Sequence, residues 1–249
     1  MQKKRIVIIG ATSAIAQHCA RLWLAESPSE FILVGRDQTR LENVATDLHL
    51  RGVSSTFRTI AVDVLDVTTI EQTANCIVKT GPVDIVLIAQ GSLPVQSTCE
   101  KDLTHCSQAL ALNGMSPVLF AEAFAKHLAH ANQGTLILIG SVAGDRAKKS
   151  NYTYGAAKCF VESYAQGLQH RFAKSNVHVI LVKPGPTATP MTTHLQNQGI
   201  KLAHVEDVAK TVVKGIKKGT PVIYAPQRWR FIMGIIRLIP RYIFNQLPL

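Results

Sequence analysis

Short apolar runs alternate with longer segments of helical periodicity along most of the chain. The runs are rich in Ile, Val and Leu and nearly continuous, which is typical of strands covered on both faces of a parallel sheet. The predicted strands lie at 5–9, 31–34, 57–62, 84–89, 135–139, 177–182 and 221–224.

The segments between these runs have the periodicity of amphipathic helices. In the last of them, residues 205–218, the apolar positions form one stripe of a helix with 3.6 residues per turn: Val205, Val208, Ala209, Val212, Val213 and Ile216. The predicted helices lie at 14–26, 37–49, 67–79, 102–130, 154–174 and 205–218. The alternation predicts an α/β fold, a Rossmann-like doubly wound sheet of about seven parallel strands with helices on both faces.

The pattern changes after Pro226, where arginines alternate with aromatic and aliphatic residues. We expect residues 1–227 to form one domain and residues 228–249 to be a basic, apolar C-terminal tail of the same domain. Pro240 should divide any helix in this tail. The mixture of charge and apolar surface suits an anionic membrane surface, and the alternative is packing on the core or on a partner subunit.

Composition narrows the class of protein. The chain has 249 residues, of which 47% are hydrophobic and 17% charged, which is typical of a globular protein. None of its apolar runs reaches the roughly 18 residues of a transmembrane helix, and the N-terminus lacks the pattern of a secretory signal. The five cysteines are scattered, so we expect reduced thiols in a cytoplasmic protein and no metal site.

Charge is concentrated at the C-terminal end. The net charge is +11, and from Lys201 onward nine Lys and Arg face only Glu206 and Asp207, a balance of nine minus two, or +7. This distribution suggests an anionic partner, namely a phosphorylated substrate, an acidic membrane surface or nucleic acid, and the alternative is a solvated face that aids solubility.

A candidate phosphate-binding turn follows the first predicted strand. Gly10 allows a tight turn, and small residues let backbone amides approach a diphosphate at the positive end of the next helix. The positions concerned are Gly10, Thr12, Ser13 and Ile15, although Ala14 and Ala16 stand where a dinucleotide fingerprint has glycine.

The next two strand ends bear on the choice of cofactor. Gly35 carries no carboxylate for an adenosine ribose, whereas Arg36 can pair with a 2′-phosphate, which favours NADPH over NADH. Asp63 and Val64 follow the third strand and are candidates for the adenine edge.

Tyr154 and Lys158 are candidates for proton transfer. Four residues along a helix turn by about 400°, so the two side chains share one face, and an ammonium about 4 Å from a phenol would lower its pKa by about three units. Tyr152, six residues before Lys158, is the poorer candidate and is interpreted as a packing or substrate-contact residue.

These residues resemble the signature of the short-chain dehydrogenase/reductase family, Tyr-x-x-x-Lys with a serine thirteen positions earlier, here Tyr154, Lys158 and Ser141. The resemblance covers about residues 5 to 191 and implies that Tyr154 protonates a substrate oxygen, that Ser141 orients it and that Lys158 holds the nicotinamide ribose. It also implies that Asn113 anchors a relay water. Residues 184–191 resemble the family's nicotinamide loop. The other cofactor positions that it implies are Gly91, Pro184, Gly185, Thr187 and Thr189.

The remainder is similar to a subgroup of reductases that act on a polyprenyl-phosphate-linked keto sugar, in residues 144–149, 225–226 and 236–244. The leading hypothesis is therefore an NADPH-dependent enzyme that reduces a ketone, or that oxidises the corresponding alcohol in the reverse direction. The alternatives are a soluble hydroxyacyl, steroid or carbonyl reductase, and a non-catalytic NADP-binding sensor or nucleic-acid binder. We expect a homodimer or homotetramer and no nucleic acid. Peripheral association with the inner face of the cytoplasmic membrane is the alternative to a purely cytoplasmic location.

Overall fold

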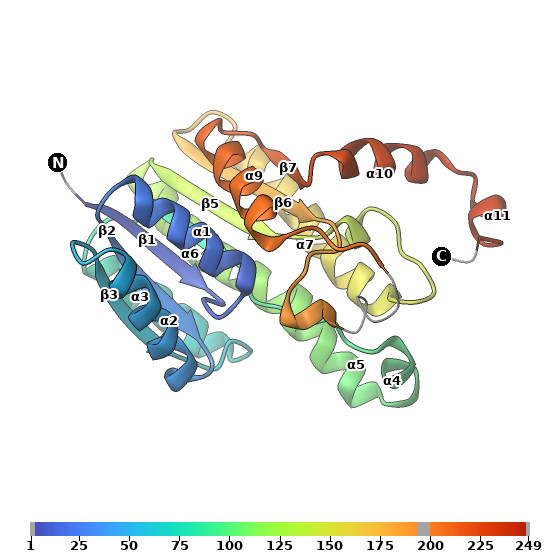
Figure 1. The fold of residues 1–249 in the computed structure, drawn as a ribbon, viewed down its shortest axis with the longest axis horizontal. Helices are drawn as coiled ribbons and strands as arrows, with labels where there is room; N and C mark the ends of the chain where they lie inside the picture. The colour runs from blue at the N-terminus through green and yellow to red at the C-terminus, as the bar shows by residue number, and fades with distance from the viewer. Residues whose placement is uncertain (1–2, 194–199, 248–249) are drawn as a thin grey trace.

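The computed structural model describes residues 3–193 and 200–247 and is built around one parallel sheet (Figure 1). Seven strands lie in the order β3-β2-β1-β4-β5-β6-β7, and every neighbouring pair is parallel. The strands are β1 Lys4–Ile9, β2 Ser29–Gly35, β3 Thr56–Ala61, β4 Ile85–Ile88, β5 Gly134–Ile139, β6 Val177–Pro184 and β7 Val222–Ala225.

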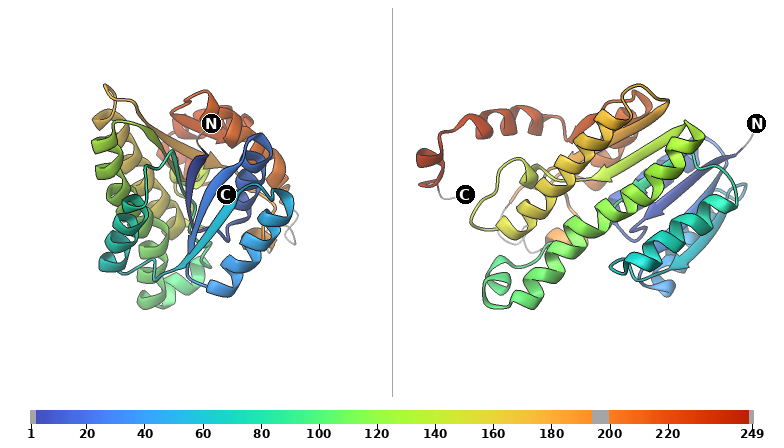
Figure 2. Two further views of the ribbon diagram at one scale, coloured as in Figure 1. Left: turned by 90° about the vertical axis from the view of Figure 1, so that its left-hand side faces the viewer. Right: turned by 180° about the vertical axis from the view of Figure 1, so that it is seen from behind.

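Helices cover both faces of the sheet (Figure 2). Side chains alternate along each strand, so Val7 and Ile9 enter one hydrophobic core and Ile6 and Ile8 the other. The first core includes α3 (Val67–Lys79), α6 (Ser116–Ala131) and α7 (Tyr152–Arg171), and the second includes α1 (Ala14–Glu26), α2 (Gln38–Arg51) and α9 (Val205–Lys217). This arrangement confirms the predicted doubly wound sheet and explains why the strands are apolar on both faces.

The predicted helix at 102–130 corresponds to unbroken helical backbone from Leu103 to Ala131, in which α5 (Leu103–Leu110), a π-helical turn (Ala111–Met115) and α6 follow one another. The short helix α4 (Gln96–Lys101) precedes it and was not predicted. Gly114 lies in that turn against α7, where an added Cβ would be 3.5 Å from the Cα of Ala157. The extra residue in the turn changes the helical register between α5 and α6, a change that apolar periodicity does not reveal.

The C-terminal tail projects from the end of the sheet beyond β7 (Figure 1). It forms α10 (Arg228–Leu238) and α11 (Arg241–Phe244), which are separated at Ile239 and Pro240 as predicted. The expected tail also includes residues 248 and 249, which lie outside the described residues. Over residues 3–193 and 200–247, no helix combines the length and the apolar character needed to cross a bilayer.

Candidate active site

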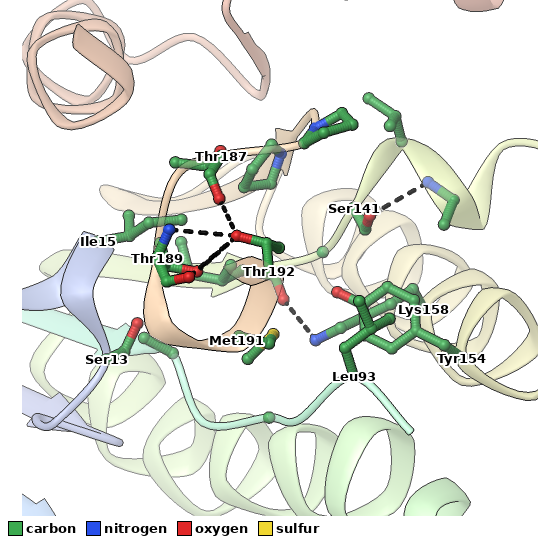
Figure 3. Close-up of a pocket in the computed structure, with 18 of the residues that line it drawn as sticks. Ser13, Ile15, Leu93, Ser141, Tyr154, Lys158, Thr187, Thr189, Met191 and Thr192 are labelled. Carbon is green, nitrogen blue, oxygen red and sulfur yellow. Dashed lines mark hydrogen bonds between the residues drawn. The ribbon is translucent and has the colours of Figure 1, made fainter. Parts of the chain in front are cut away.

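A cavity of about 510 Å³ lies at the carboxyl end of the parallel strands. The order of the sheet reverses between β1 and β4, and the crevice at such a reversal is where doubly wound sheets bind ligands. The lining comes from the loops after β1 to β6, from the π-helical turn and α7, and from the tail. Figure 3 shows several of these side chains converging on the cavity.

Gly10 fits the turn after β1 for two separate reasons. Its φ is +78°, a conformation that favours glycine, and a Cβ there would lie 2.4 Å from the backbone nitrogen of Gln90. Thr12, Ser13 and Ile15 line the cavity beside it, and Ser13 directly precedes α1. The open backbone and the helix N-terminus fit the diphosphate of a dinucleotide.

Cations line the cavity where β2 ends. Arg36, which the sequence suggested as a partner for a 2′-phosphate, is exposed and lines the cavity, and Arg40 lies there as well. The carboxylate of Asp37 accepts a hydrogen bond from the Arg40 amide at 3.0 Å and so caps α2. Sequence reasoning missed Arg40, which lies in the first turn of α2, whereas Arg36 precedes the N-cap Asp37.

The two candidates after β3 lie differently. Val64 is buried and lines the cavity. Asp63 is exposed and is absent from the lining, because its carboxylate turns back to accept a hydrogen bond from the Leu65 amide at 2.9 Å. The structure thus brings only one of this pair to the proposed adenine side.

Ser141, Tyr154 and Lys158 all line the opposite part of the cavity (Figure 3). Ser141 follows β5, and its Oγ accepts a hydrogen bond from the Ala143 amide at 3.1 Å, which fixes the hydroxyl. Lys158 is buried, and its Nζ donates to the Ile139 carbonyl at 3.0 Å. The same Nζ lies 5.7 Å from the centroid of the Tyr154 ring. The three side chains meet between β5 and α7.

The expected lowering of the phenol pKa is not what this geometry produces. Burial raises the pKa of Tyr154 to about 12, and the Ser141 hydroxyl acts in the opposite direction. Burial also lowers the pKa of Lys158 to about 8. The Coulomb argument assumed an ammonium beside the phenol oxygen, but the pKa of Tyr154 is set mainly by burial, and attraction to Lys158 does not contribute to it. Tyr154 is therefore held as the neutral acid.

Asn113 lies in the π-helical turn and is completely buried. Its Oδ1 accepts a hydrogen bond from the Ser92 amide at 2.9 Å, and its Nδ2 donates to the Ala109 carbonyl at 2.8 Å. A Cβ on Gly91 would lie 2.9 Å from Oδ1 and 3.7 Å from the Nζ of Lys158. Gly91 thus lies between the two side chains, and Asn113 fixes the loop that lines the cavity, while its expected role toward a relay water stays a prediction.

The loop after β6 supplies Pro184, Gly185, Thr187 and Thr189 to the lining. Thr187 Oγ1 donates to the Gly185 carbonyl at 2.8 Å, and the Thr192 hydroxyl contacts both Thr187 and Thr189 (Figure 3). The resemblance to a nicotinamide loop therefore falls on a segment that lines the cavity and whose threonine hydroxyls bond within the loop.

The C-terminal tail forms a wall of the cavity. The indole of Trp229 packs on Gly185 so closely that an added Cβ would lie 1.9 Å from its Nε1. The tail residues in the lining are Trp229, Met233, Ile236 and Phe244. Arg146 and Lys148, on the loop after Ser141, also line the cavity, and sequence reasoning gave them no individual role.

Tyr152 lies outside the cavity lining. It is exposed by 45%, and its hydroxyl donates to Glu100 at 3.4 Å. Of the two tyrosines at the start of α7, only Tyr154 is placed for chemistry in the cavity.

Comparison with known proteins gives a consistent result. The family model described as short chain dehydrogenase matches residues 4–199. The chain is 27% identical over 247 residues to an uncharacterized oxidoreductase of Streptomyces coelicolor, covering 98% of this chain and 96% of that protein.

Two solved structures are similar in fold. A short-chain dehydrogenase of Burkholderia cenocepacia in complex with NADP has a TM-score of 0.83 and 18% identity, with 99% of each chain covered. A 3-oxoacyl-[acyl-carrier protein] reductase of Brucella melitensis in complex with NAD has a TM-score of 0.78 and 19% identity, with 90% of this chain and 96% of that chain covered.

Proposed function

The chain belongs to the short-chain dehydrogenase family and is an oxidoreductase, and from this premise we propose that it reduces a ketone with NADPH. The observation that carries the proposal is the convergence of Ser141, Tyr154 and Lys158 on one cavity next to the Gly10 turn. That turn fits the diphosphate of a dinucleotide, and the three side chains suit proton transfer to a carbonyl oxygen of a substrate.

The nicotinamide, when bound, supplies the hydride that is added to the carbonyl carbon. The phenol of Tyr154 gives its proton to the carbonyl oxygen, which completes the alcohol. Ser141 donates a hydrogen bond that orients this oxygen, since its hydroxyl already accepts from the Ala143 amide. Lys158 holds the ribose side of the cofactor, and Asn113 positions the Gly91 loop against it.

The preference for NADPH over NADH rests on the cations after β2. Arg36 and Arg40 both line the cavity, and the carboxylate of Asp37 is engaged in capping α2. A 2′-phosphate would meet two positive charges there, whereas a ribose hydroxyl would lack an acidic acceptor on Gly35.

A narrower proposal concerns the substrate, a polyprenyl-phosphate-linked keto sugar. What supports it is the combination of a cation and apolar side chains in the outer cavity, Lys148 beside Trp229 and Met233. A general carbonyl reductase with a soluble substrate is the competing candidate. Inhibition of ketone reduction by farnesyl phosphate but not by farnesol would favour the phosphate-linked substrate, and equal inhibition would favour the general reductase.

The tail and the helices carry the proposals about partners. We propose that residues 228–249 belong to the same domain as residues 1–227. The tail would lie on the anionic inner face of the cytoplasmic membrane, because its exposed apolar residues alternate with arginines.

A homodimer or homotetramer is supported by exposed apolar side chains on the layer from α5 to α7, namely Leu103, Met115 and Phe160. Sedimentation would test the oligomeric state.

The central experiment is NADPH oxidation with a panel of ketones, followed by absorbance. Turnover that requires Tyr154 supports the reductase. Tight NADPH binding without turnover of any ketone, or of any alcohol with NADP, would instead favour the non-catalytic sensor.

A further inference from the structure

Arg146 connects the loop after Ser141 to the C-terminal wall, defined here as residues 228–244. Its Nη1 donates to the carbonyls of Ile236 and Ile239, each at 2.6 Å, and lies 3.4 Å from that of Arg237. Its guanidinium also stacks on the Phe244 ring, 3.8 Å from the centroid. One side chain therefore contacts both helices of the wall.

These contacts match the physical needs of a helix end. The last carbonyls of a helix lack amide partners four residues on, and the negative end of the helix dipole favours a cation. At the end of α10 the Ile236 carbonyl accepts only a long bond from the Ile239 amide, at 3.3 Å. The planar guanidinium supplies several donors and a face for aromatic stacking at the same time. A lysine would keep the charge but would lack this geometry.

The neighbouring Asp145 gives the contact a rigid base. Its side chain is fully buried and contacts the ammonium of Lys183, which also pairs with Glu162 at 2.7 Å. Tyr224 donates to the same carboxylate at 3.2 Å, and Arg237 of the wall approaches it to 3.8 Å. The loop is thereby fixed to β6, α7 and β7 before Arg146 reaches the tail.

We propose that Arg146 is a positioning residue that holds the C-terminal wall over the outer cavity and so determines which substrates are accepted. Trp229, Met233, Ile236 and Phe244 line the cavity. At its N-terminal end α10 is held by the packing of Trp229 on Gly185, and at its C-terminal end by the bonds from Arg146. The part that concerns substrates rests on the proposed ketone reduction, while the position of the wall does not.

The first test measures the wall directly. Hydrogen exchange of backbone amides in residues 228–247, followed by mass spectrometry, is compared among wild type, Arg146→Met, Arg146→Lys and Arg230→Met. Arg230 is an exposed arginine on α10 and serves as the control. We expect exchange to be roughly tenfold faster in Arg146→Met, because the cap and the stacking contact are lost, and faster to a smaller degree in Arg146→Lys.

A wild-type exchange pattern in Arg146→Met would overturn the proposal, as would an equal increase in Arg230→Met. The melting temperature and the Kd for NADPH are measured for each variant. Faster exchange throughout the chain, or loss of NADPH binding, would assign Arg146 to general stability and would also overturn the proposal.

The second test concerns substrate selection. The ratio of kcat/KM for 2-octanone to that for 2-butanone is measured for the same variants. We expect Arg146→Met to lower this ratio through KM for the longer ketone while kcat for 2-butanone is retained, since only the longer chain reaches the wall. An unchanged ratio together with faster exchange would contradict the effect on specificity. Failure of wild type to reduce any ketone would instead count against the proposed function, and the exchange result would still decide the position of the wall.

Discussion

The ammonium of Lys158 lies over the ring of Tyr154, 5.7 Å from its centroid, on the same face of α7. Burial acts on the two groups in opposite directions, raising the pKa of Tyr154 to about 12 and lowering that of Lys158 to about 8. Both shifts favour the uncharged forms, so without cofactor this part of the site resists carrying charge.

Lys158→Met should stabilise the cofactor-free enzyme at neutral pH. The pKa of Lys158 falls from 10.5 to about 8 on folding, so between these values the unfolded chain binds more protons and wild-type stability rises with pH. Burial of the Lys158 amine thus lowers the free energy of unfolding of the wild type by about 3 kcal/mol below about pH 8, and this loss disappears above pH 10.5. Chemical denaturation from pH 7 to 11 measures it.

The exposed Lys149→Met variant is the control for this experiment. A stability difference between wild type and Lys158→Met that stays constant across this pH range would show that the amine is not forced toward neutrality by burial.

Tyr154→Phe should reduce turnover by about 10²- to 10⁴-fold, because the proton donor is lost. The Kd for NADPH, measured by fluorescence titration, should change little, since the ring remains. Tyr152→Phe is the matched control, as its hydroxyl contacts Glu100 outside the cavity. Near-normal turnover in Tyr154→Phe with loss in Tyr152→Phe would reverse the assignment.

Arg36→Ala should raise KM for NADPH by about 10- to 100-fold, the loss expected for a charged hydrogen bond of about 1.5–3 kcal/mol. KM for NADH is the internal control and should stay within about twofold, because its ribose carries no phosphate for Arg36 to pair with. If both values rise equally, Arg36 supports the loop rather than selecting the cofactor.

Several parts of this fold were predictable because they depend on local pattern. Helices α1 and α3 have the predicted bounds, since an uninterrupted apolar stripe specifies each. The π-helical turn around Asn113 was missed because contacts distant in sequence accompany it, including the bond to the Ser92 amide and the close approach of Gly114 to α7. The apolar periodicity of a segment does not indicate contacts between residues that are distant in sequence.

The candidate site was also predictable only where it depends on local sequence pattern. Ser141, Tyr154 and Lys158 were predictable from spacing along the chain. The role of Arg146 was not, because its partners lie 90 or more residues away. Nor did spacing predict that burial would raise the pKa of Tyr154, since desolvation depends on everything packed around the phenol.

Gly10→Ala should weaken NADPH binding and lower the melting temperature. The φ of +78° disfavours alanine, and the new Cβ would meet the Gln90 backbone at 2.4 Å, so the turn and the end of β4 must move apart. Gly167→Ala in α7 is the control, because a Cβ there meets nothing within 4 Å. It should add about 0.5–1 kcal/mol of stability through helix propensity. Equal binding and melting temperatures in Gly10→Ala and wild type would contradict the close approach.

The tail should bind vesicles that contain acidic lipid. Phe231, Ile235, Leu238 and Tyr242 are each exposed by 68% or more, and an arginine near an acidic leaflet contributes about 1 kcal/mol. In flotation with phosphatidylserine vesicles, the wild-type protein should rise with the vesicles, while a Phe231→Ser/Leu238→Ser variant should remain in the bottom fraction of the gradient. Absence of wild-type binding, or undiminished binding by that variant, would leave the exposed face to a partner subunit.

The wall that contains Trp229, Met233 and Phe244 begins only after the last strand of the sheet has ended. All the residues proposed to hold NADPH or move a proton precede it in the chain. The lining of the outer cavity can therefore be exchanged as one continuous block of sequence, which makes residues 228–244 a natural segment for grafting from related reductases to alter substrate range while the hydride-transfer machinery is left unaltered.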